Sequence, residues 1–233
     1  MSSLAQPPAV PVDKERIYIW EFPVRLIHWV LFFAIIILSV TGFYIGHPFI
    51  SVPGPAREHF VMGTMRAIHL YTAAFFSAAV LFRIYWFFAG NRFARITDFI
   101  PLRRERLRGW WRTFQYYCFL KPHPEVYPGH DALAASSYGF IFLVYLLLMA
   151  TGLALYTVYA PVNSPFQVFQ FLIPVFDGLQ VARLIHHICM YLMFIFVVIH
   201  VYSVILWALI EDSGEVDSIF NGHKFWPKGK KVP

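Results

Sequence analysis

Four long runs of the sequence consist almost entirely of apolar residues and are separated by shorter, more polar segments. The runs cover residues 24–45, 61–89, 133–158 and 182–210. Each run is long enough to cross about 30 Å of hydrocarbon as an α-helix. A further apolar stretch, residues 166–176, is only about half that length and contains Pro174, so we expect it to lie at the membrane interface. The pattern therefore predicts four transmembrane helices.

The overall composition agrees with this pattern. Of the 233 residues, 58% are hydrophobic and 14% are charged, and 25 are phenylalanine. This balance is far more apolar than that of a soluble domain of similar size. We therefore expect an all-α integral membrane protein, in contact with lipid, whose four spans form a helical bundle.

Lysine and arginine residues gather in alternate loops. Residues 91–132 contain eight of them, the C-terminal segment contains four, and Lys14 and Arg16 precede the first span. The other two loops contain only Arg57. By the positive-inside rule, both termini and the middle loop face the cytoplasm. The net charge of +6 is then explained by membrane topology, and we expect no nucleic acid partner.

The segments outside the spans divide the chain into three parts. We expect a disordered N-terminal tail over residues 1–17, of which residues 1–12 are small and proline-rich. The membrane domain then covers residues 18–212, and a basic cytoplasmic tail covers residues 213–233. Within the middle loop, residues 103–120 mix arginines with aromatic residues, which predicts an amphipathic helix on the inner membrane surface. An electrostatic contact with a partner is the alternative interpretation.

The two cysteines do not form a metal or redox motif. Cys118 and Cys189 are far apart, without the CxxC or CxxCH spacing of iron–sulfur ligation, thiol redox chemistry or covalent haem attachment. Motifs for nucleotide binding or hydrolysis are also lacking in the sequence. Candidate chemistry is therefore found in the spans, where several histidines occur.

The spacing of the histidines in the fourth span favours two separate sites. His186 and His200 are fourteen residues apart, so at about 100° per residue they lie within about 40° of the same helix face. His187 and His200 point to different sides. With a rise of about 1.5 Å per residue, His186 and His200 are roughly 21 Å apart along the helix, too far to hold one metal ion together.

The predicted topology supplies a partner for each of these histidines. His28 lies near the inner end of the first span, and His69 lies near the outer end of the second span. We therefore predict an outer pair, His69 with His186, and an inner pair, His28 with His200. Neutral imidazole is a good iron ligand, so two non-covalent bis-histidine haems fit this arrangement. The alternative is that these histidines only form hydrogen bonds between helices.

Two further residues follow the same spacing. Gly42 lies fourteen residues after His28, where a haem could approach the backbone, although plain helix packing is an equal alternative. Arg83 lies fourteen residues after His69, at the inner depth. It could pair with a haem propionate or a quinone oxygen, or extend to the inner interface. His130, just before the third span, is a candidate for proton delivery.

Several motifs resemble those of the b-type cytochrome subunit of membrane-bound nickel–iron uptake hydrogenases. They are RLIHW (25–29), TGFYIG (41–46), MRAIH (65–69), RIYWFFAGNRFAR (83–95), GHDALA (129–134), TGLALY (151–156) and HHICMYLMFIFVVIHVY (186–202). The resemblance extends from about Tyr18 to Lys224. The sequence departs from the family at Arg183, where members often have another histidine.

This resemblance implies a diheme cytochrome b of the bacterial inner membrane that reduces quinone. The family's haem ligands fall on His28, His69, His186 and His200. The implied partners are the small and large subunits of a periplasmic hydrogenase, with the small subunit's C-terminal helix beside the cytochrome. The chain would transfer electrons without splitting hydrogen itself. A cytochrome of the formate dehydrogenase or thiosulfate reductase type, and a haem-free membrane anchor, are the alternatives.

Overall fold

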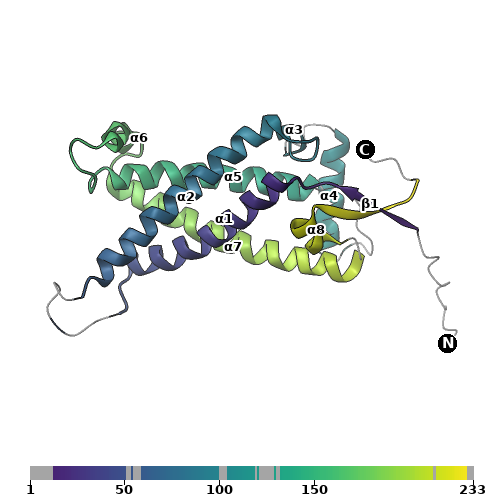
Figure 1. Ribbon diagram of the computed structural model, residues 1–233, viewed down its shortest axis with the longest axis horizontal. Helices are drawn as coiled ribbons and strands as arrows, with labels where there is room; N and C mark the ends of the chain where they lie inside the picture. Colours follow the sequence, from purple (N-terminus) through teal and green to yellow (C-terminus); the bar gives the residue numbers. More distant parts are fainter. Residues whose placement is uncertain are drawn as a thin grey trace.

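The computed structural model describes residues 13–50, 54, 59–99, 104–118, 120, 129, 132–211 and 214–229. Four long helices run lengthwise through the molecule, as Figure 1 shows. They are α1 (Phe22–Gly46), α2 (Val61–Ala89), α5 (Ala132–Tyr156) and α7 (Leu179–Glu211). Within the described residues, these four helices have the length and apolar composition needed to cross a membrane. The prediction of a helical membrane bundle with four spans is confirmed.

The four helices pack as two pairs that are joined across the bundle. α1 packs on α2, and α5 packs on α7. Between α5 and α7 lies a core of Ile141, Val144, Cys189 and Met193. A second core of Ala34, Phe76 and Val80 joins α1 to α2, and aromatic residues of α5 pack against it. The bundle interior is therefore filled by side chains from all four helices.

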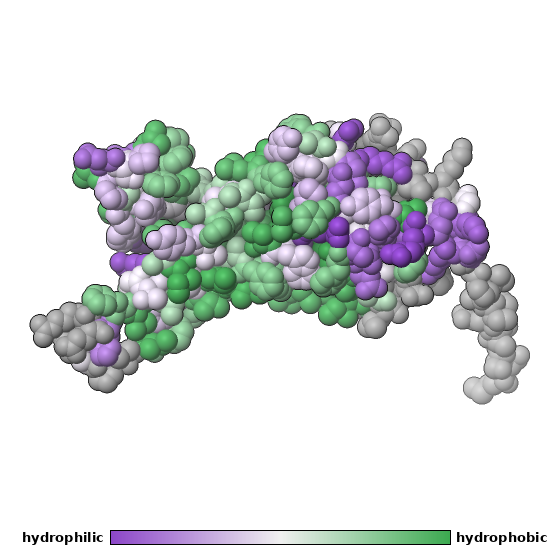
Figure 2. Space-filling model, in the orientation of Figure 1, coloured by the Kyte–Doolittle hydropathy of each residue, from purple (hydrophilic) through white to green (hydrophobic). Residues whose placement is uncertain are grey.

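Many large apolar side chains are exposed outside this interior. Figure 2 shows hydrophobic residues along the flanks of the long helices and hydrophilic residues gathered at one end. In water this exposed apolar surface would be unfavourable, whereas in a bilayer it contacts lipid tails. The helical form itself follows, because within hydrocarbon each backbone N–H and C=O must be paired inside its own segment.

A small sheet closes one end of the bundle, which we call the sheet end. Strand β1 (Lys14–Tyr18) pairs antiparallel with β2 (His223–Pro227), in a register that sets Lys14 opposite Pro227. A short helix, α8 (Glu215–Asn221), precedes β2. The prediction of a disordered tail through residue 17 is therefore wrong for residues 14–17. Disorder of residues 1–12 remains a prediction, because they lie outside the described residues.

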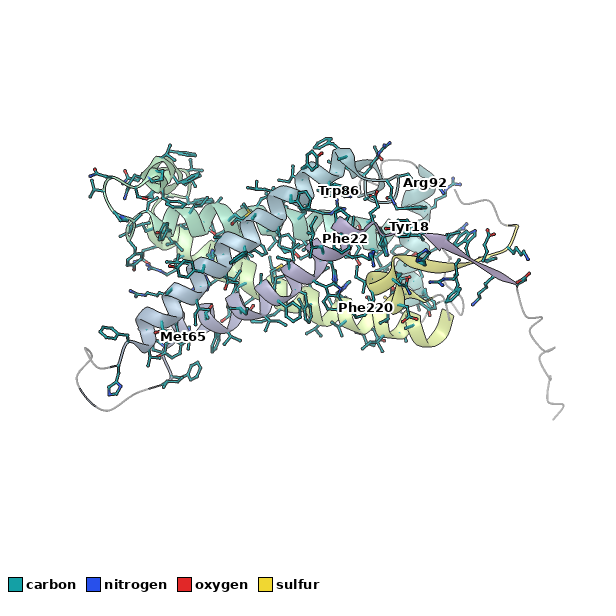
Figure 3. The ribbon with its side chains drawn as sticks, in the orientation of Figure 1. Tyr18, Phe22, Met65, Trp86, Arg92 and Phe220 are labelled. Carbon is teal, nitrogen blue, oxygen red and sulfur yellow. The ribbon has the colours of Figure 1, made fainter. Side chains whose placement is uncertain are left out.

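The sheet end is tied to α1 and α2 by hydrogen bonds around one carboxylate. Glu21, which precedes α1, accepts hydrogen bonds from Trp86 Nε1 at 3.0 Å and from the backbone N–H of Asn91 at 2.8 Å. Asn91 Nδ2 donates to the carbonyl oxygen of Ile19 at 2.8 Å. In Figure 3, Trp86 lies toward this end of the molecule, and Met65 lies at the opposite one. This network fixes the start of α1 relative to the end of α2.

The connecting segments contain three more short elements and one longer helix. α3 (Ile96–Phe99) and α4 (Arg104–Tyr117) follow α2, and Trp110 of α4 donates a hydrogen bond to Ser136 of α5. The predicted amphipathic helix thus exists and packs on α5 at the sheet end. At the opposite end, the short apolar stretch forms a 3-10 helix, η1 (Pro165–Phe171), followed by α6 (Leu172–Val175).

Candidate functional site

The inner pair, His28 and His200, comes together inside the bundle. His28 projects from α1 and His200 from α7, and their ring centres are 6.4 Å apart with the ring planes inclined by 50°. The ring of Phe196 stacks on His200 at 5.5 Å, and Tyr138 approaches it edge-on at 5.9 Å. Two helices that are distant in the sequence therefore bring their imidazoles close together, with aromatic rings around them.

The spacing and the hydrogen bonding of this pair fit a shared metal. Imidazole nitrogens bind a first-row metal at about 2 Å, so two rings on opposite sides of one ion have centres roughly 6 Å apart. Nδ1 of His28 is buried, and among the described residues it has no hydrogen-bond partner. A polar atom buried in this way is costly unless another group satisfies the ring. The inner pair can therefore accommodate a bound metal centre.

At the outer pair, His69 is held against α1. Its Nδ1 lies 2.9 Å from Oγ1 of Thr41, and the Thr41 hydroxyl donates to the carbonyl oxygen of Ile37 at 2.7 Å. A Cβ atom added to Gly42 would lie only 3.1 Å from Cε1 of His69. The glycine therefore leaves the space that the imidazole ring occupies.

The second histidine of the outer pair has the same surroundings on another pair of helices. Nδ1 of His186 lies 2.9 Å from Oγ1 of Thr151, whose hydroxyl donates to the carbonyl oxygen of Leu147 at 2.6 Å. A Cβ atom added to Gly152 would lie 3.4 Å from Cε1 of His186. His186 and His69 are also close enough to interact electrostatically. A threonine–glycine step thus supports each histidine of the outer pair.

The other predicted residues have different positions. Gly42 contacts the ring of His69, so the space beside it is filled by that imidazole. Arg83 donates two hydrogen bonds to the carbonyl oxygen of Ala94, at 3.2 and 3.1 Å, and lies over the ring of Phe87. Its role toward a propionate or a quinone therefore remains a prediction. His130 lies outside the described residues.

Two residues next to His186 take no part in the outer pair. The ring of His187 turns toward Gly46 of α1, with Cε1 3.6 Å from the position of an added Cβ. Arg183 donates to Oε1 of Gln180 at 2.7 Å, within its own helix. The neighbouring histidines thus face different helices, as the helical spacing predicts.

The donor set favours a cofactor that brings most of its own ligands. Among the described residues, no group of three or more His, Cys, Asp or Glu side chains could hold a metal ion. A bare ion between two histidines would lack ligands, because structural and catalytic metal sites use three or four protein donors. A tetrapyrrole supplies four nitrogens and needs only two axial imidazoles. Both pairs therefore fit haem better than a free ion.

Comparison with known proteins agrees with this chemistry. The family model described as prokaryotic cytochrome b561 matches residues 19–222. The chain belongs to the prokaryotic cytochrome b561 family. With four apolar helices and this membership, it is a multi-pass protein of the bacterial inner membrane.

Curated relatives of this family member share a common description, "Probable Ni/Fe-hydrogenase B-type cytochrome subunit". One from Cupriavidus necator is 35% identical over 89% of this chain and 86% of the relative. One from Rhizobium leguminosarum bv. viciae is 31% identical over 92% and 91%. The corresponding hydrogenase 1 subunit of Escherichia coli K12 is 32% identical over 91% and 92%. The resemblance noted from the motifs is confirmed.

The threonines of this cytochrome family member are the site residues that sequence reasoning missed. Thr41 and Thr151 each precede a glycine near the end of a span, and that repeated pair was visible in the sequence. The role of these threonines could not be seen in the sequence. Only the packing of α1 on α2 and of α5 on α7 places each hydroxyl next to a histidine.

Proposed function

We propose that this chain is a diheme cytochrome b that carries electrons across the membrane from a nickel–iron hydrogenase to quinone. The observation that carries the proposal is the proximity of the His28 and His200 imidazoles, whose ring centres are 6.4 Å apart inside the bundle. Each haem b would be held by two imidazoles and would carry one electron at a time. Membership of the cytochrome b561 family supports the same cofactor.

The proposal of two haems rests on the separation of the histidine pairs. His186 and His200 both project from α7 and are roughly 21 Å apart along its axis, from the rise per residue. One cofactor cannot reach both residues. His69 and His28 would provide the second ligand for each. Both lie in the first half of their helices, and α2 and α1 run in opposite directions, which separates them along the bundle. A haem near each membrane surface would allow electrons to cross in two short steps.

The hydrogenase partner is proposed from the relatives and from the motifs. The curated relatives are described as subunits associated with Ni/Fe-hydrogenase. We propose that the small and large hydrogenase subunits lie on the outer side, with the small subunit's C-terminal helix beside this chain. The hydrogenase would split hydrogen, and this chain would only transfer the electrons.

Quinone is proposed to bind near the inner pair. Arg83 lies on α2 toward the sheet end, where its guanidinium binds the carbonyl oxygen of Ala94. This position is at the inner depth if both termini face the cytoplasm. A guanidinium near the membrane surface is suited to a quinone oxygen or a haem propionate.

Donor specificity tests the proposal. Membranes from cells with and without this chain are supplied with hydrogen or with formate, and quinone reduction is followed. In a third sample, thiosulfate is supplied as the electron acceptor, and quinol oxidation is followed. We expect deletion to abolish hydrogen-dependent quinone reduction and to leave the other two rates unchanged. Loss of the formate or thiosulfate rate instead would assign a different partner enzyme. Purified protein that contains no haem would show instead that the chain is only a membrane anchor.

A further inference from the structure

The two threonines of the outer pair have a hydrogen-bond arrangement that determines which nitrogen of each histidine carries the proton. Oγ1 of Thr41 lies 2.7 Å from the carbonyl oxygen of Ile37, and Oγ1 of Thr151 lies 2.6 Å from that of Leu147. Two oxygen atoms this close must share a proton, because otherwise their lone pairs repel. The carbonyl has no proton to give, so each threonine hydroxyl is the donor.

The remaining contact of each hydroxyl must then be an accepted hydrogen bond. A threonine has a single hydroxyl proton and two acceptor lone pairs. With that proton committed to the carbonyl, Oγ1 can only accept from the imidazole nitrogen 2.9 Å away. Nδ1 of His69 and Nδ1 of His186 are therefore protonated. In neutral imidazole this leaves Nε2 with the lone pair that binds a metal.

The inner pair has different surroundings. Among the described residues, Nδ1 of His28 has no hydrogen-bond partner. Nδ1 of His200 lies 3.4 Å from the hydroxyl of Tyr138, half an ångström farther than the threonine contacts. These contacts differ from the close threonine contacts of His69 and His186.

We infer that Thr41 and Thr151 are positioning residues that fix the tautomers of His69 and His186, direct Nε2 toward the outer haem, and lower the midpoint potential of that haem. A hydrogen bond donated by Nδ1–H makes Nε2 a stronger donor, and a stronger donor stabilises ferric over ferrous iron. This inference rests on the proposed function. A lower potential at the outer haem suits electrons that enter there and leave at the inner one.

The test is a redox titration of the purified, haem-loaded full chain. Thr41→Val and Thr151→Val keep the shape of the side chain and remove the hydroxyl. We expect each variant to retain about two haems per chain. In both variants the midpoint potential of one haem should rise, and it should be the same haem. Thr41→Ser and Thr151→Ser, which keep the hydroxyl, should restore the original value.

A matched control comes from a threonine outside the site. Thr157 is buried and its hydroxyl donates to the carbonyl oxygen of Ala154, so Thr157→Val removes a similar hydrogen bond. We expect this variant to leave both potentials unchanged. Unchanged potentials in Thr41→Val and Thr151→Val, shifts of different haems, or an equal shift in Thr157→Val would overturn the inference.

A second measurement covers valine variants that fail to fold or to retain haem. In the reduced, diamagnetic form of the unaltered protein labelled with 15N-histidine, NMR reports each axial Nδ1–H directly. We expect the Nδ1–H of His69 and that of His186 to show the downfield proton shift of a strong hydrogen bond. An ordinary shift at both would refute the role of the threonines while the diheme proposal stands. Protein without haem would overturn both.

Discussion

The imidazole of His28 lies beside that of His200 with 6.4 Å between ring centres, although the two residues belong to the first and the last of the four long helices. Such a pair predicts how haem is lost on mutation. His28→Ala and His200→Ala should each reduce the haem content from two to one per chain, because a single imidazole holds haem weakly. Combining both changes should still leave one haem. Pyridine haemochrome quantification on purified variants provides the measurement.

A double variant that takes one histidine from each pair tests the assignment of the pairs more strictly than the single variants do. The double variant His28→Ala with His186→Ala removes one ligand from each pair, so it should contain no haem. His187→Ala is the matched control, since its ring turns toward Gly46 and it should retain two haems. One haem remaining in the double variant would show that the pairs are assigned wrongly.

The two glycines beside the outer histidines should tolerate alanine unequally. An added Cβ would lie 3.1 Å from His69 at Gly42 but 3.4 Å from His186 at Gly152, and only the second is an ordinary van der Waals distance. Gly42→Ala should therefore displace the ring and lower stability by about 1–3 kcal/mol. Thermal loss of the haem absorbance reports the difference.

Gly152→Ala is the control variant for that experiment. We expect it to remain close to the unaltered protein in both haem content and thermal midpoint. Equal loss from the two variants would mean that the fit of His69 against α1 is no tighter than that of His186 against α5.

Arg83 should contribute to the stability of the sheet end. Arg83→Gln removes the two charged donors to the carbonyl oxygen of Ala94, which should cost about 1–3 kcal/mol. Arg83→Lys should recover only part, because an ammonium cannot reproduce the planar fork of a guanidinium. Thermal unfolding in detergent measures this. Arg92→Gln is the control, since Arg92 is exposed. If this control lost as much stability as Arg83→Gln, the stabilising role of Arg83 would be contradicted.

The native cysteines allow a test of membrane orientation. Cys118 is exposed just after α4, and Cys189 is buried within α7. In sealed right-side-out vesicles, a membrane-impermeant maleimide should label Cys118 only after permeabilisation, because the positive-inside rule sets α4 on the cytoplasmic side. A Cys118→Ser variant with a new cysteine at Phe49 should be labelled without permeabilisation. The reverse pattern would invert the topology.

The sequence predicted the spans closely because hydrophobic length is a direct consequence of bilayer thickness. The predicted span 61–89 coincides with α2, and the predicted 182–210 lies within α7. The sheet between β1 and β2 could not be predicted in this way. Its two strands are five residues each and come from opposite ends of the chain, so their pairing depends on contacts that no local pattern encodes.

For the site, the sequence predicted which histidines share a helix face, while the ligand roles remain predictions. Helical spacing selects His186 over His187, and the structure turns these two rings toward different helices. The contribution of Thr41 was not predictable, because a threonine bonded to the preceding turn of its own helix is common in apolar helices. Only the approach of α2 makes it a partner of His69.

The central claim is that this bundle holds two non-covalent b haems, one for each histidine pair. Pyridine haemochrome analysis of the purified, unaltered chain, combined with a protein determination, tests it most directly. The account predicts two protohaems per chain, both extractable with acidified acetone. A chain that contains no protohaem, or that contains only one at full occupancy, would contradict it.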